Sequence, residues 1–137
     1  MPIASPPDDD EDRTKARAKI FFERGQAVAE TGNYEYAIEM YIQGLNVDPD
    51  NVKAHQALRD ISLKRKTNGG RDMGMFDKMK ILKADDEKQA MLNAEKLLAY
   101  LPGDVGRIRA FLDAAQLAGM RDTAEWIGTI LRRAMDP

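Results

Sequence analysis

Matching residues recur along this chain at separations that agree with one another. Ala37 and Ala90 are 53 positions apart, and Pro49 and Pro102 are separated by the same number. Ala90 and Ala124 are 34 positions apart. A period of about 34 residues is typical of proteins that stack one supersecondary unit on the next. The difference between the two spacings, 19 residues, then indicates an insertion in the middle copy.

The first copy carries two segments with the residue spacing of amphipathic helices, over residues 13–30 and 34–46. Gly32, which lies between them, is the usual residue type just after the C-terminus of a helix. Pro49 ends the second segment, because the residue before a proline avoids the helical conformation. A third helix is expected over residues 52–66. The sequence therefore predicts an all-α fold of antiparallel helices joined by short turns.

A helix–turn–helix unit of this length resembles the tetratricopeptide repeat. In the first copy the residues that carry the resemblance are Phe21, Gly25, Gly32, Tyr34, Ala37, Tyr41, Gly44, Leu45 and Pro49. In the other copies they are Leu58, Ala90, Ala94, Leu97, Leu98 and Pro102, then Ile108, Phe111, Ala115, Gly119 and Ala124.

The resemblance implies three units, over residues 16–50, 51–103 and 104–137. It places the insertion, residues 66–84, between the two helices of the middle unit. About six helices would then stack as a short right-handed superhelix, in which neighbouring units complete one another's core.

The N-terminal segment has a different composition. Residues 1–12 hold three prolines and end in the acidic run DDDED. Such a segment cannot bury enough apolar surface to order itself, so we expect a flexible acidic tail before a repeat domain over residues 13–137. Its acidic end would suit the N-terminus of the helix that follows.

The concave face of a tetratricopeptide superhelix is a binding surface, lined mostly by the first helix of each unit. The resemblance therefore places a partner-binding groove at Lys19, Phe22, Gln26, Lys53, Gln56, Asp60, Arg109 and Asp113. Phe22 points about 100° away from Phe21 around the helix, so it is a candidate anchor for a partner peptide. The alternative is that Phe22 packs on the insertion or on the tail.

The leading functional hypothesis is a non-catalytic protein–protein interaction or scaffold module that holds a peptide in this groove. Two alternatives remain open from the sequence. One is a self-associating structural adaptor, and the other is a regulatory N-terminal domain of a larger protein.

The insertion combines a turn signal with apolar and basic residues. Its candidate contact residues are Met73, Met75, Phe76 and Met79, and from Met75 onward the spacing suits one or two turns of amphipathic helix. Methionine side chains adapt to irregular partner surfaces. The segment either folds back as a cap on the repeats or contacts a partner, and it is too short for firm membrane anchoring.

Basic residues dominate residues 59–83, with eight lysines and arginines against three aspartates. Such a stretch can contact RNA phosphates, but no stacking aromatic pattern accompanies it. A solvated face, or an intramolecular dock for the acidic tail, explains it as well.

The last predicted helix, residues 123–135, is apolar on more than one side. Trp126 and Ile130 lie on one of these sides, and an exposed patch there would favour a homodimer or contact with a partner. The alternative is local packing of Trp126.

Composition argues against several other classes. The chain has no cysteine and one histidine, so no metal site or other cofactor is expected. His55 follows a turn between units, where a packing role is expected rather than general-base catalysis, and we expect no enzyme. The net charge is −2, the start of the chain does not read as a signal peptide, and no apolar run approaches the roughly 20 residues that span a bilayer. A cytoplasmic protein is the expectation.

Overall fold

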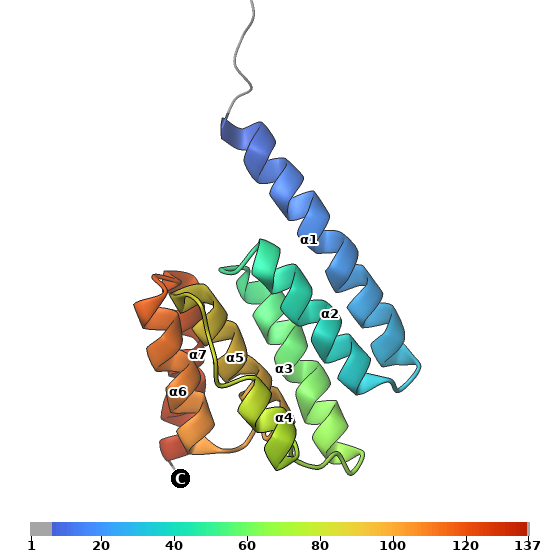
Figure 1. Cartoon of the computed structure of the whole chain (residues 1–137), viewed down its shortest axis with the longest axis vertical. Helices are drawn as coiled ribbons and strands as arrows, with labels where there is room; N and C mark the ends of the chain where they lie inside the picture. Colours follow the sequence, from blue (N-terminus) through green and yellow to red (C-terminus); the bar gives the residue numbers. More distant parts are fainter. Residues whose placement is uncertain (1–6, 137) are drawn as a thin grey trace, which may run out of the picture.

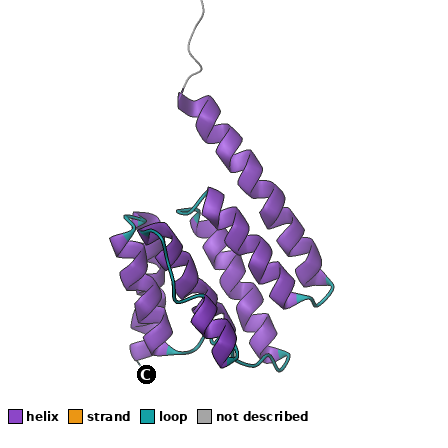
Figure 2. Cartoon of the chain, viewed as in Figure 1, coloured by secondary structure: helices purple, strands orange, loops and turns teal. Residues whose placement is uncertain are grey.

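The computed structural model describes residues 7–136, and Figure 2 shows helices, loops and no strand within this range. The elements are α1 (Pro7–Glu30), α2 (Tyr34–Val47), α3 (Val52–Thr67), α4 (Met75–Lys80), α5 (Glu87–Tyr100), α6 (Val105–Leu117) and α7 (Arg121–Met135). The all-α class predicted from the sequence is confirmed.

Short turns with local caps join most of the helices. Gly32 adopts φ 86° after α1, a backbone conformation that residues with a Cβ rarely take. The side chain of Asn33 then accepts a hydrogen bond from the amide of Tyr36, and Asn51 caps α3 in the same way through the amide of Ala54. These turns make α1, α2 and α3 successive antiparallel neighbours (Figure 1).

The direction of α5 differs from the prediction. Lys88, in the first turn of α5, donates a hydrogen bond from Nζ to the carbonyl of Asn46 near the end of α2. The guanidinium of Arg65, in the last turn of α3, lies 4.3 Å from the ring centre of Tyr100, the last residue of α5. Helix α5 therefore runs parallel to α3 and antiparallel to α2 (Figure 1).

The predicted middle unit, residues 51–103, paired α3 and α5 as antiparallel helices, and the parallel direction of α5 corrects this. Helices α3 and α5 do not form a hairpin with an insertion, because residues 68–86 carry the chain back to the end where α3 began. Helix α5 forms its hairpin with α6 instead, and α4 occupies part of the returning segment. The first residues of α3, α5 and α7 are 52, 87 and 121, so the period of 34 to 35 residues lies in helices that run in the same direction.

Helix α3 lies at the centre of the fold. It packs against α2, α5 and α7, while α6 packs against both α5 and α7. The predicted right-handed superhelix stays a prediction. The largest fully buried apolar side chains are Phe111, Ile38, Leu45, Leu58, Met91, Leu92, Ile108 and Ile127.

Helices α1 and α2 approach closely where glycine faces an aromatic ring. A Cβ on Gly25 would lie 2.7 Å from the ring of Tyr41, and a Cβ on Gly44 would overlap the ring of Phe22. The rings of Phe22 and Tyr41 stack with centres 5.5 Å apart. Gly25 and Gly44 therefore let α1 and α2 approach closely.

The boundary predicted for the acidic tail is too late in the chain. Residues 7–12 belong to α1, while residues 1–6 lie outside the described range. Proline is favoured at the first position of a helix, and acidic residues in the first turns interact favourably with the helix dipole. An exposed pair between Lys15 and Glu11, 3.9 Å apart, adds a contact of the kind that supports a helix.

Candidate functional site

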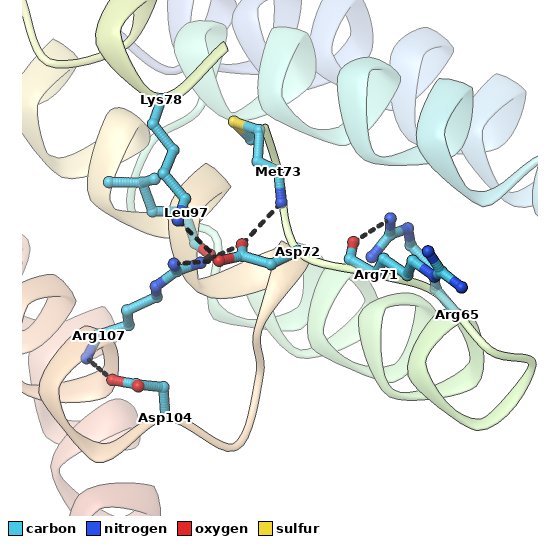
Figure 3. A network of polar contacts seen from close by, with 8 residues as sticks. All are labelled: Arg65, Arg71, Asp72, Met73, Lys78, Leu97, Asp104 and Arg107. Atoms are coloured by element: carbon cyan, nitrogen blue, oxygen red, sulfur yellow. Dashed lines mark hydrogen bonds and ion pairs between the residues drawn. The ribbon is translucent and has the colours of Figure 1, made fainter. Parts of the chain in front are cut away.

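The returning segment between α3 and α5 is fixed to the body by Asp72 (Figure 3). Both carboxylate oxygens of Asp72 accept hydrogen bonds from the Arg107 guanidinium, at 2.8 and 2.7 Å. Lys78 Nζ lies 2.9 Å from the same carboxylate, and the Met73 amide donates to it at 2.7 Å. The hydrogen bond from Arg107 is the main reason that the pKa of Asp72 lies far below its ordinary value, with Lys78 and the Met73 amide lowering it further against partial burial. Arg107, at the start of α6, thus ties the segment to the body.

A second attachment lies at the end of α3. Arg65 donates from Nη2 to the carbonyl of Arg71 at 2.6 Å and from Nε to the Glu35 carboxylate at 3.1 Å. The Gly70 amide donates back to the Arg65 carbonyl at 2.9 Å, and a Cβ on Gly70 would lie 2.6 Å from Arg65 Cγ. Because Arg65 also covers the ring of Tyr100, the turn at residues 68–71 is held against both α2 and α5.

Beyond these attachments the segment exposes apolar side chains. Met75, Phe76, Met79 and Leu82 are 72%, 83%, 60% and 70% exposed. We call these four residues the α4 patch. A contiguous exposed apolar patch on a protein surface often marks a binding site. The patch is therefore the candidate functional site of this chain.

A hollow of about 390 Å³ separates α4 from the body. Its lining includes Met73, Ile81 and Tyr100 together with charged groups such as Asp77 and Lys96. Met73 is 9% exposed, so it is a packing anchor at the root of the segment. This corrects its prediction as a partner contact, whereas Met75, Phe76 and Met79 point outward as a contact surface requires.

The predicted groove residues do not come together as one surface. Phe22 packs on α2 against Tyr41 and Gly44, so its ring is not a free anchor. Gln26 accepts a long hydrogen bond of 3.5 Å from the Tyr41 hydroxyl. Arg109 faces α7, where its Nη2 lies 3.2 Å from the sulfur of Met135. The remaining predicted groove residues, Lys19, Lys53, Gln56, Asp60 and Asp113, are exposed.

Part of the predicted groove does line a hollow. Lys19 and Phe22 join Lys15 from α1 and the turn at residues 48–51 around a space of about 400 Å³. Positive and negative side chains are both present there, since Asp48 and Asp50 lie on the turn.

Trp126 and Ile130 are partly buried against the core. The Trp126 ring stacks on His55 with centres 6.4 Å apart, so local packing accounts for the tryptophan. An exposed tryptophan patch, on which the predicted homodimer depended, is absent from the described part of α7.

His55, on α3, lies fully buried against residues of α5, α6 and α7, in line with the packing role expected for it. Its Nδ1 is 2.6 Å from Glu95 Oε2, and its Nε2 donates to the Pro49 carbonyl at 2.8 Å. Burial alone lowers the pKa of His55, but the charge and hydrogen bond of Glu95, the Pro49 carbonyl and the charge of Asp50 outweigh burial and raise it. Both ring nitrogens serve the fold, so neither is free to exchange a proton with a substrate.

Sequence reasoning missed the residues that position the site. Asp72 and Arg107 are 35 positions apart and carry no local motif that pairs them. Arg65 appeared only as one member of the basic stretch. Only the glycine pair before Arg71 indicated the tight turn on which these contacts depend.

Taken together, these features define an all-helical protein with a short amphipathic helix held away from its body. None of the helices within residues 7–136 is long and apolar enough to cross a membrane. Comparisons with known proteins found no family model, no curated protein and no solved structure that matches the chain.

Proposed function

We propose that this protein is a non-catalytic helical-repeat module that binds another protein or a peptide. The observation that carries the proposal is the α4 patch, four apolar side chains that are 60–83% exposed on a segment anchored at its root. Anchoring supports a binding role, because a surface that is already ordered loses less conformational entropy when a partner arrives. The proposal keeps the resemblance to tetratricopeptide repeats, because α3, α5 and α7 begin 34 to 35 residues apart.

The hollow beside Lys19 and Phe22 is a second candidate site for the same class of partner. It preserves the part of the predicted groove that lies on α1, and it offers charged groups around one aromatic ring. Its mixed charges and smaller apolar content give it less support than the α4 patch.

Affinity capture from an extract of the source organism tests the proposal. The full chain would be immobilised, and bound proteins would be quantified by mass spectrometry for the wild type and for a Phe76→Ser, Met79→Ser double variant. Leu117→Ser is the matched control, because Leu117 is 71% exposed on α6, away from the patch. Loss of the same proteins from the double variant alone supports the proposal.

Lys19→Glu probes the second candidate site in the same experiment. Proteins lost with Lys19→Glu and kept by the double variant would move the binding site to α1. If every captured protein is retained by both variants, the proposed function through either surface is wrong.

A further inference from the structure

The apolar and charged residues of α4 lie on different sides of the helix. At about 100° per residue, Met79 is about 40° from Met75 around the helix, whereas Asp77 is about 200° from it. Asp77 accordingly lines the hollow beneath α4, and Met75 and Met79 face outward. Lys80 lies between Phe76 and Asp77 around the helix, and it is exposed while also lining the hollow with Asp77.

Two of the acidic side chains near the α4 patch, Asp72 and Asp86, already have hydrogen-bond partners. Asp72 is occupied by Arg107 and Lys78. Asp86 accepts a hydrogen bond from the Gln89 amide and caps α5. The acidic residues at positions 85–87 stand at the beginning of α5, whereas the end of α4 lies beside the end of α5, where Ile81 and Tyr100 line one hollow.

The basic side chains at the patch remain available. Lys83 is exposed, and its carbonyl accepts a hydrogen bond from Asn93 halfway along α5. Lys80 makes only a 4.0 Å contact with the exposed Asp77, which contributes little in water. Two lysines therefore border the apolar surface, and Asp77, the acidic residue of α4, lies about 200° from Met75 around the helix.

We propose that the α4 patch binds an acidic amphipathic peptide segment of a partner protein. This inference rests on the proposed function and adds the chemistry of the partner. Apolar side chains of the peptide cover Met75, Phe76 and Met79, and its carboxylates face Lys80 and Lys83. Buried aromatic and apolar contacts supply most of the affinity in such interfaces, while charge complementarity sets orientation and association rate.

Two other occupants fit the patch less well. A second copy of the chain would bring its own Lys80 and Lys83 against the same residues, and like charges at an interface are unfavourable. An anionic membrane surface would satisfy the lysines, but six residues of helix bury too little apolar surface for stable anchoring.

Peptide display tests the chemistry of the partner and does not require the partner to be identified first. A random 16-residue library would be selected on the immobilised full chain, and enriched peptides would be labelled for anisotropy titration. We expect enriched peptides with a net negative charge and apolar residues at helical spacing. Phe76→Ser should weaken their binding by at least about tenfold, and a Lys80→Glu, Lys83→Glu double variant should do the same. Leu117→Ser on α6 and Arg121→Glu on α7, both at exposed positions, should leave the affinity unchanged.

The outcomes separate this inference from the proposed function. Peptides that depend on Phe76 but are neutral or basic would overturn the acidic partner and leave a binding module in place. If no enriched peptide depends on Phe76 for binding, the α4 patch is not a peptide-binding site. If the selection yields no acidic peptides and the chain co-sediments with phosphatidylserine vesicles only when Phe76 is present, the occupant of the α4 patch is a membrane surface. If it yields none and light scattering shows a dimer that depends on Phe76, the occupant is a second copy of the chain.

Discussion

The Nδ1 atom of His55 lies 2.6 Å from Oε2 of Glu95, although the two residues are 40 positions apart and both are buried. On the other side of the ring, Nε2 donates to the Pro49 carbonyl, which can only accept. One imidazole thus joins α3, α5 and the turn before α3. Among the described residues, Oε1 of Glu95 is the buried side-chain oxygen without a hydrogen-bond partner.

Glu95→Ala should lower the free energy of unfolding by about 3 kcal/mol, because it leaves a buried imidazole without its partner. Urea unfolding followed by circular dichroism measures the change. Glu23→Ala is the control, since Glu23 forms an exposed pair with Lys19 at 3.7 Å and should change stability little. Equal losses in the two variants would mean that the buried pair does not stabilise the core.

The stability of the fold should decrease as the pH rises above neutrality. The pKa of His55 is raised in the folded protein relative to its ordinary 6.5, so the folded state binds a proton more tightly than the unfolded chain. The stabilisation from His55 is therefore fully present below about pH 6.5 and is lost as the pH rises through the folded-state pKa. Unfolding free energies between pH 5.5 and about 9 measure this trend. The His55→Asn variant should lose this pH dependence, and a wild-type stability that rises over the same range would contradict the assignment.

Much of the fold follows from local sequence signals, and the direction of α5 does not. Gly32 and Pro49 mark helix ends through backbone conformations that hold in any context, so the limits of α2 were predicted to within one residue. Pro102 follows α5 in the same way that Pro49 follows α2. The equal spacings therefore assigned α2 and α5 to equivalent places in two repeat units, although the two helices run in opposite directions. The path of residues 68–86 decides which way α5 runs, and that path depends on tertiary contacts.

In the candidate site, too, local signals predicted the helix, whereas tertiary contacts decide how it is held. The apolar spacing of Met75 and Met79 predicted a short amphipathic helix, and α4 is that helix. The inward side chain of Met73 and the ion pair of Asp72 with Arg107 depend on residues that meet only after α5 and α6 are in place. Phe22 was misassigned because nothing in the local sequence shows that Gly44 leaves room for its ring.

Two glycines within helices should respond oppositely to the same substitution. Gly44→Ala should destabilise the protein by about 1–3 kcal/mol, because the new methyl group overlaps the ring of Phe22 at the α1–α2 contact. Gly128→Ala places its methyl group in open space on α7 and should stabilise by up to about 1 kcal/mol, since alanine is the better helix former. Urea midpoints of both variants measure the difference. Similar midpoints would show that α1 is not packed closely on α2.

Asp72→Asn should release the returning segment from the body without unfolding it. The neutral amide cannot keep two charge-assisted bonds to Arg107, so the segment should open more often. Hydrogen exchange at residues 71–83, measured by mass spectrometry, should become several-fold faster, while exchange in α3 and α5 stays the same. Asp77→Asn is the control, because Asp77 makes only an exposed contact with Lys80. Unchanged exchange in Asp72→Asn would show that Arg107 does not hold the segment.

The parallel arrangement of α3 and α5 can be tested by distances between spin labels. The chain has no cysteine, so single cysteines can be introduced at the exposed positions Lys53, Lys66 and Glu87 without background labelling. If α5 runs parallel to α3, a label at Glu87, the first residue of α5, should lie close to one at Lys53. The label at Lys66 should then be farther from Glu87, by roughly the 20 Å length of a 14-residue helix. A hairpin of α3 and α5 interrupted by an insertion requires the reverse order, because Glu87 would then lie near the end of α3. Pulsed dipolar spectroscopy resolves this difference, and the reverse order would also remove the structural basis for placing the α4 patch beside the end of α5.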